Sequence, residues 1–160
     1  MKTISETVDA SASVYVDPDR IQTAYPDFIF PEGGVHIRWP DKPLDQEYRL
    51  QKYKLYAAIA FARANKIDQI KIDSKNARLG IVTSGKSYQD VLQALDDLGI
   101  DKERASQLGV RLYKVGMPWP LEPEGIKEFT KGLDEILVVE EKRAVIENQL
   151  KEQLFQIFFF

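Results

Sequence analysis

The stretch from Arg78 to Arg143 alternates short apolar runs with amphipathic segments, and this alternation constrains the fold more than any other feature. The apolar runs 78–84, 110–115 and 136–139 are typical of buried strands, whereas residues 88–98 repeat apolar side chains at helical spacing. Strands that alternate with helices at this interval predict βαβ units. We therefore expect an α/β domain whose mostly parallel sheet is covered by helices on both faces, a three-layer α/β/α sandwich.

A Gly-Lys-Ser turn follows the first of these strands. Residues 80–87 read Gly-Ile-Val-Thr-Ser-Gly-Lys-Ser and satisfy the phosphate-loop pattern G-x-x-x-x-G-K-S, so a nucleotide-binding protein that uses Gly80–Ser87 is one alternative. In a working phosphate loop the first glycine ends the strand, and the next residues wrap around the phosphates. Ile81 and Val82 instead form the apolar centre of the only available strand, which argues against nucleotide hydrolysis.

The turn alone is also a candidate anion site, without nucleotide hydrolysis. Ser84, Gly85, Lys86 and Ser87 precede a predicted helix, whose free N–H groups and dipole favour an anion. Ser87 is a candidate N-cap for that helix. The alternative is purely structural: Gly85 permits the tight turn, Ser87 caps the helix, and Lys86 is solvated.

Three further residues are candidates for contacts. Glu140 follows the last strand, at the edge where ligands of open α/β sheets bind, and it serves there as a ligand or as an ion-pair partner. Trp119 lies in the proline-rich loop Met117–Pro123, which would present it rigidly to another domain or subunit. Trp39 is a second interface candidate, or an anchor for the N-terminal segment. No residue is predicted to be catalytic.

Composition excludes several kinds of site. The 160 residues include no cysteine and one histidine, so the chain lacks the thiolates of an iron–sulfur cluster and the usual ligands of zinc, and we predict no metal site. Its 22 basic and 25 acidic residues give a net charge of −3, which is unlike the basic footprint of a nucleic-acid-binding protein. We see no signal peptide and no membrane-spanning stretch, and expect a cytoplasmic protein without membrane partners.

The pattern divides the chain into four parts. Residues 1–43 are rich in proline and glycine and form an extended arm, residues 44–65 form a long helix, and residues 66–155 form the α/β domain. The aromatic tail 156–160 is assigned no function. The second half of the long helix is apolar on nearly every side, so we expect it to be buried, with one side on the sheet. The other side is left for the N-terminal arm or a missing domain, and in the isolated chain self-association as a homo-oligomer would hold part of the arm.

Several segments carry a family resemblance. Ile81-Val-Thr-Ser-Gly-Lys-Ser87, Ala94-Leu-Asp-Asp-Leu-Gly-Ile100, Leu121-Glu-Pro and Ile136-Leu-Val-Val-Glu-Glu141 resemble the C-terminal domain of transketolase-like, thiamine-diphosphate-dependent enzymes. Three other segments are similar to bacterial indolepyruvate ferredoxin oxidoreductases of the fused type: Pro31-Glu-Gly-Gly-Val-His-Ile-Arg-Trp-Pro-Asp41, Ala57-Ala-Ile-Ala-Phe-Ala-Arg-Ala-Asn65 and Val139-Glu-Glu-Lys-Arg-Ala-Val-Ile-Glu-Asn148. The resemblance covers residues 1–155 and fades after Leu154.

The resemblance implies a fold and a function. The sheet would have about five strands, mostly parallel, with one antiparallel edge strand. The chain would be a non-catalytic docking domain of an enzyme that converts aryl-pyruvates to aryl-acetyl-CoA and reduces ferredoxin. The whole enzyme would use thiamine diphosphate, magnesium, iron–sulfur clusters and coenzyme A, and this chain would bind none of these cofactors. Its partners would be the remaining domains of the enzyme, with ferredoxin as a partner of the whole enzyme. The Gly-Lys-Ser turn is the candidate contact for a coenzyme A phosphate. A stand-alone interaction module is the remaining alternative.

Overall fold

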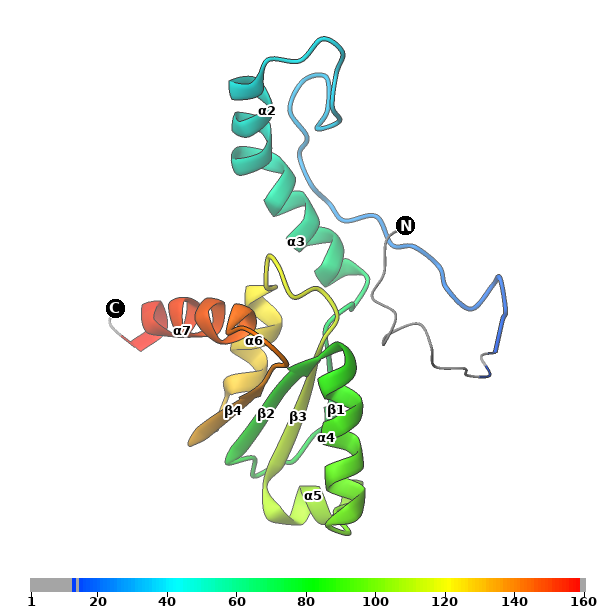
Figure 1. Cartoon of the computed structure of the whole chain (residues 1–160), viewed down its shortest axis with the longest axis vertical. Coiled ribbons are helices and arrows are strands. Elements are labelled where there is room, and N and C mark those ends of the chain that lie inside the picture. The colour runs from blue at the N-terminus through cyan, green and yellow to red at the C-terminus, as the bar shows by residue number, and fades with distance from the viewer. Residues whose placement is uncertain (1–12, 14, 159–160) are drawn as a thin grey trace.

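The computed structural model describes residue 13 and residues 15–158 and contains two parts (Figure 1). One part is an α/β sandwich, and the other is a long helical segment that projects from it with an extended arm alongside. The expected tail 156–160 lies partly outside the described residues; its first three residues, to Phe158, continue the last helix. No helix in the described part of the chain is long and apolar enough to cross a bilayer.

In the part of the chain that the structure describes, the sheet has four strands in the order β1-β3-β2-β4. The central strands β2 (Leu79–Ser84) and β3 (Val110–Val115) are parallel, and β4 (Glu135–Val139) pairs in parallel with β2. The edge strand β1 (Gln69–Ile72) pairs antiparallel with β3. The mostly parallel sheet with one antiparallel edge is therefore confirmed.

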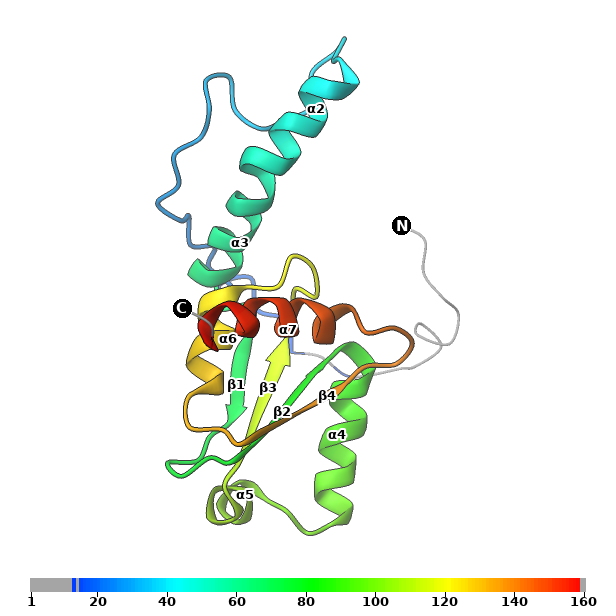
Figure 2. The same ribbon diagram turned by 90° about the vertical axis from the view of Figure 1, so that its left-hand side faces the viewer.

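Alternation along the strands produces two separate cores. Ile81 and Leu112 are register partners and face α4 (Gly85–Asp97) and α5 (Lys102–Leu108). Val82 and Tyr113, the next pair, face α6 (Pro123–Thr130) and α7 (Val145–Phe158). Successive strand residues point to opposite faces, so each central strand supports both helical layers. Figure 2 shows these layers from the side.

The expected count of five strands is wrong by one. The chain passes from β4 into helix α7, and the arm, residues 15–42, contributes no strand to the sheet; only its later part runs beside the projecting helix (Figures 1 and 2). Neither segment is therefore available to add a fifth strand.

The projecting segment is one continuous helix with a π-helical turn inside it. It consists of α2 (Pro43–Arg49), the π turn η1 (Leu50–Lys54) and α3 (Leu55–Ala64). In η1 the Leu55 N–H donates to the Leu50 carbonyl, five residues earlier. The long helix was predicted, whereas the change to π geometry was not.

The expected burial of this helix is wrong. Ala62 is its one buried residue, and Tyr56 and Phe61 are 59% and 39% exposed. Only the C-terminal end of α3 reaches the sandwich, so the apolar second half does not pack on the sheet (Figure 1). Helical periodicity indicated an apolar surface, but it contains no information about what covers that surface.

The arm is held to the helix at two places. At one, the side chain of Asn65 accepts a hydrogen bond from Ala24 N–H and donates one to its carbonyl, at 2.9 and 2.8 Å. At the other, Arg49 forms an ion pair with Asp41, whose carboxyl also accepts from Arg38 N–H. These contacts lower the pKa of Asp41, and the hydrogen bond from Arg49 is the largest cause.

Candidate functional site

The parallel strands β2, β3 and β4 bring their carboxyl ends to one edge of the sheet. At this edge lie the Ser84–Ser87 turn after β2, the proline-rich loop after β3, and Glu140 after β4. Ligands of open α/β sheets bind at such edges, and from the sequence Glu140 was expected at one of these strand ends.

The turn after β2 exposes a helix N-terminus. Helix α4 begins at Gly85, its N-cap is Ser84, and the Ser84 side chain makes no capping hydrogen bond. Gly85 has a positive φ of 54°, which favours glycine, and nothing lies within 4 Å of the position of an added Cβ. The prediction that Ser87 caps the helix is wrong, because Ser87 lies inside the first turn and is buried.

Lys86 points to solvent and pairs within its own helix. Its Nζ donates to both carboxylate oxygens of Asp90, at 2.9 and 2.8 Å, and both side chains are largely exposed. The hydrogen bond to Asp90 is the largest cause of a raised Lys86 pKa, and the negative charge of Glu141 also contributes. The turn therefore combines open N–H groups with a cation that an exposed carboxylate holds only weakly.

The phosphate-loop alternative does not fit this geometry. Gly80 through Ser84 belong to β2, so the residues that would wrap around phosphates are paired with β3 and β4. Gly80 is required by packing, since a Cβ there would lie 2.6 Å from Phe129 Cζ. The match to the pattern is a coincidence of letters.

Glu140 has a structural role in this structure. Its Oε1 accepts from the N–H groups of Val145 and Ile146 at 3.0 and 2.8 Å, and its Oε2 accepts from Glu147 N–H at 3.1 Å. The carboxylate therefore satisfies the open N-terminus of α7 and fixes that helix to the end of β4.

The two tryptophans are displayed on different parts of the molecule. Trp39 is 97% exposed in the arm, and Trp119 is 59% exposed in the loop between β3 and α6. The structure does not bring them together with the Ser84–Ser87 turn into one pocket. Trp119 lies in a loop that hydrogen bonds from neighbouring elements hold in place.

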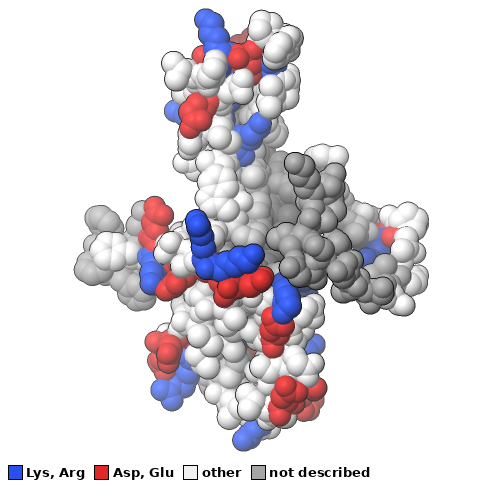
Figure 3. Space-filling view, viewed as in Figure 1, with Lys and Arg blue, Asp and Glu red and all other residues white. Residues whose placement is uncertain are grey.

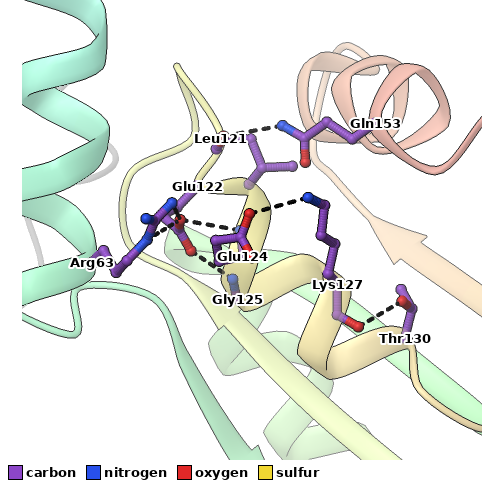
Figure 4. Close-up of polar contacts among 8 residues, drawn as sticks. All are labelled: Arg63, Leu121, Glu122, Glu124, Gly125, Lys127, Thr130 and Gln153. Atoms are coloured by element: carbon purple, nitrogen blue, oxygen red, sulfur yellow. Dashed lines mark hydrogen bonds and ion pairs between the residues drawn. The ribbon is translucent and has the colours of Figure 1, made fainter. Parts of the chain in front are cut away.

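The loop that carries Trp119 is fastened at both ends. At its start, Asp68 Oδ1 accepts from the N–H groups of Gly116 and Met117 at 2.7 and 3.0 Å. At its end, Glu122 is 4% exposed and accepts two hydrogen bonds from Arg63, at 2.8 and 2.6 Å (Figure 4).

Glu122 also begins the next helix. Its carboxylate accepts from the N–H groups of Glu124 and Gly125 at 3.1 and 2.6 Å, so that it is the N-cap of α6. One buried carboxylate therefore joins the projecting helix, the loop and the sandwich. The cap satisfies two open N–H groups, while the Arg63 guanidinium compensates for burial of the charge.

Helix α7 secures the middle of the same loop. Gln149 accepts from Leu121 N–H and donates to the Pro118 carbonyl, both at 2.8 Å. Gln153 donates to the Leu121 carbonyl at 3.0 Å (Figure 4). We call the residues that fasten this loop the loop clamp; they are Arg63, Asp68, Glu122, Gln149 and Gln153.

A cleft of about 150 Å³ opens beside the clamp, lined in part by Asp68, Tyr113 and Glu122. Burial raises the pKa of Asp68, and the nearby charge of Glu122 adds to this effect. The second carboxyl oxygen of Asp68 is buried and has no hydrogen-bond partner. Burial also raises the pKa of the Tyr113 phenol. Burial thus disfavours the negatively charged forms of Asp68 and Tyr113, although charged side chains such as Arg63 and Lys66 also line the cleft.

Sequence reasoning missed most of the clamp. Glu122 before a helix-starting proline is a signal for a helix N-terminus, although not for an ion pair with Arg63. Asp68, Gln149 and Gln153 lack any local pattern, because their partners lie 28 to 49 residues away in the chain.

The face of the molecule shown in Figure 3 carries charges of both signs. Lysine and arginine alternate with aspartate and glutamate over the face shown in Figure 3, without a broad patch of one sign. Among residue 13 and residues 15–158, no three side chains of histidine, aspartate or glutamate gather as metal ligands.

Comparison with known proteins decides the family. The profile described as "Indolepyruvate oxidoreductase domain" matches residues 69–157, which is more than half of the chain. The chain belongs to this family. The matched region begins at β1 and ends in α7, so it contains the sandwich and the later part of the loop clamp but not the projecting helix.

Relatives within the indolepyruvate oxidoreductase family are much longer than this chain. The indolepyruvate oxidoreductase subunit IorA of Pyrococcus horikoshii is 37% identical over 81 residues, which are 51% of this chain and 11% of that subunit. IorA of Methanothermobacter thermautotrophicus is 27% identical over 126 residues, 75% of this chain and 19% of the subunit. The chain thus spans less than a fifth of the length of these relatives.

One solved structure is similar to a larger share of this chain. The 2-oxoglutarate:ferredoxin oxidoreductase from Magnetococcus marinus, with 2-oxoglutarate, coenzyme A and succinyl-CoA bound, covers 87% of this chain with a TM-score of 0.46. The identity is 15%, and the match covers 22% of that enzyme's chain.

Proposed function

We propose that this indolepyruvate oxidoreductase domain is a structural docking domain of a larger 2-oxoacid ferredoxin oxidoreductase and has no catalytic activity of its own. The observation that supports this most directly is the loop clamp, which fastens the loop that carries the exposed Trp119 to the projecting helix and to the sandwich. Five side chains serve to hold one loop in place, which is what a surface pre-organised for another domain requires.

The ionisable groups at the sheet edge support the same proposal. Glu140 caps α7, and Glu122 caps α6 and pairs with Arg63. Each of these carboxylates accepts hydrogen bonds from several donors of the protein itself, so its oxygens are engaged in structural contacts. Their arrangement fits support of the sheet edge better than acid–base chemistry.

The reaction proposed for the whole enzyme is the oxidative decarboxylation of an aryl-pyruvate to an aryl-acetyl-CoA, with reduction of ferredoxin. Thiamine diphosphate, magnesium and iron–sulfur clusters would be bound by other domains. This chain has no cysteine, so its residues do not fit an iron–sulfur cluster, and we derive no step through one. Other domains of the parent enzyme are therefore the proposed partners.

The Ser84–Ser87 turn is the proposed place for an anion, such as a phosphate of coenzyme A. The uncapped N-terminus of α4 and the open space at Gly85 support this assignment. Thermal unfolding with and without millimolar coenzyme A tests it. We expect a rise in Tm that Lys86→Ala abolishes and that Lys75→Ala, an exposed lysine in the β1–β2 loop, retains. An unchanged Tm of the unsubstituted chain would refute the assignment of the anion site.

A further inference from the structure

Two neighbouring hollows meet beside the loop clamp, at the end of α3. One is the cleft of about 150 Å³ next to Glu122, and the other is a wider hollow of about 680 Å³. Four residues line both of them: Lys66, Asp68, Tyr113 and Gly125. Together the two hollows offer the space that a small-molecule site needs.

Two polar groups at this junction lack partners. Tyr113 is 2% exposed, and within the described residues its hydroxyl makes no hydrogen bond. Gly125 leaves room for that hydroxyl, because an added Cβ would collide with it. Asp68 Oδ2 is also buried and unpartnered, although Oδ1 accepts hydrogen bonds from the loop. Buried polar groups normally have partners, so both groups point to a polar ligand.

Charges of both signs are left unpaired at the same place. The other acidic and basic side chains along the two hollows form ion pairs, which are Arg63–Glu122, Glu124–Lys127 and Glu128–Lys131 (the first two in Figure 4). Lys66 is exposed, and its ammonium has no partner in the described part of the chain. Asp68 likewise has no ion-pair partner among those residues. One carboxylate and one ammonium therefore remain to bind the opposite charges of a ligand.

Lys66 keeps a side chain where the backbone favours glycine. Its φ of 49° is the one positive value at a non-glycine residue in the described part of the chain. Lys66 directly follows Asn65, the C-cap of α3, and glycine is the usual residue at that position. A lysine there costs conformational energy, which favours a role for its ammonium group.

An apolar surface lies next to these polar groups. Ile70 is the register partner of Tyr113, so the two side chains lie on the same face of the sheet. Ile70 lines the wider hollow and is 37% exposed. We propose that this site binds a free α-amino acid with an apolar side chain. Asp68 takes the ammonium, Lys66 takes the carboxylate, the Tyr113 hydroxyl adds a hydrogen bond, and the side chain packs over Ile70.

Isothermal titration calorimetry of the purified chain with L-phenylalanine tests the proposal, at mildly alkaline pH so that Asp68 carries its charge. We expect saturable binding with a Kd of about 1 mM or tighter. Phenethylamine lacks the carboxylate, and hydrocinnamate lacks the ammonium. Each should bind at least about tenfold more weakly, because each leaves one charge of the site without its partner.

Two variants remove the two charges and keep the fold. Lys66→Gly introduces the residue that the backbone favours, so its Tm should not fall below that of the natural chain. Asp68→Asn keeps the acceptor for the N–H groups of Gly116 and Met117. Each variant should weaken the binding of L-phenylalanine at least about tenfold. Circular dichroism verifies that both are folded.

Matched controls change the same residue types elsewhere on the surface. Lys75→Ala and Asp97→Asn replace an exposed lysine and an exposed aspartate, and both should bind L-phenylalanine as the natural chain does. An absence of binding up to about 10 mM L-phenylalanine would overturn the proposal. Equal affinities for the amino acid and its two analogues would also overturn it, as would an unchanged affinity in both Lys66→Gly and Asp68→Asn.

Discussion

Arg63 at the end of α3 and Glu122 at the start of α6 are joined by two hydrogen bonds to one carboxylate oxygen, across 59 residues of sequence. Glu122 is 5% exposed in its side chain and Arg63 is 51% exposed, so the acid is the buried partner. This pair is the main polar connection between the projecting helix and the sandwich. The clamp makes the orientation of the helix depend on the same carboxylate that starts α6.

Replacement of Glu122 should therefore affect stability more than replacement of its exposed neighbour. Glu122→Ala removes a helix cap and a charge-assisted pair, and we expect a loss of about 2–3 kcal/mol in the free energy of unfolding. Glu124→Ala removes an exposed ion pair with Lys127 and should cost no more than about 0.5 kcal/mol. Urea unfolding of both variants measures the difference, and equal losses would contradict the clamp.

Asp68 should make the protein less stable as the pH rises. Burial raises the pKa of Asp68 in the folded state above the ordinary 3.8. The stabilisation of the folded state that comes from protonated Asp68 is therefore fully present below about pH 3.8 and is lost as the pH rises through the folded-state pKa. Asp68→Asn retains the acceptor for Gly116 and Met117 but removes the titration. Relative to the natural chain, the variant should gain stability between pH 4 and pH 7.

The control for this titration is Asp97→Asn, which changes an exposed carboxyl at the end of α4. Urea unfolding at several pH values should give the same pH dependence for this variant as for the natural chain. A stability difference between Asp68→Asn and the natural chain that stays constant with pH would contradict the assigned role of Asp68.

Gly80 should be intolerant of even one methyl group. Its added Cβ would meet the Phe129 ring and the Leu133 side chain, both packed in the core against β2. Gly80→Ala should destabilise the domain by about 1–3 kcal/mol through overpacking. Thermal unfolding checks this, and a neutral or stabilising effect would show that Gly80 is not held by packing.

Mg-ATP should not stabilise the chain. The strand that contains Gly80–Ser84 stays paired on both sides, so it is unable to wrap around a triphosphate. We expect no change of Tm in millimolar Mg-ATP. A rise in Tm that Lys86→Ala removes would revive the phosphate-loop alternative.

The sandwich was largely predictable because its signals are local. The alternation of strands and helices reflects the periods of the two structures, and the central strands appear within one residue of the expected ranges. Helix α5 was not predicted, although its N-cap Asp101 and its left-handed Gly109 are recognisable helix boundaries. The fifth strand was taken from a resemblance and not from the residues, and this expectation failed.

The clamp and the π turn η1 were not predictable, for two different reasons. Arg63 and Glu122 meet through the tertiary fold, which no local pattern encodes. The π turn Leu50–Lys54 was missed because periodicity read along the chain assumes a uniform helix. The individual contact residues also changed roles: Glu140, expected as a strand-end ligand or ion-pair partner, is the cap of α7.

The most direct test of the proposed function is an activity assay on the purified, folded chain. Indolepyruvate, coenzyme A, thiamine diphosphate and magnesium are supplied with oxidised methyl viologen, and its reduction is followed by absorbance. A docking domain without catalytic groups of its own should give no reduction above the protein-free blank, while circular dichroism verifies the fold. Viologen reduction that requires both indolepyruvate and coenzyme A would contradict the account.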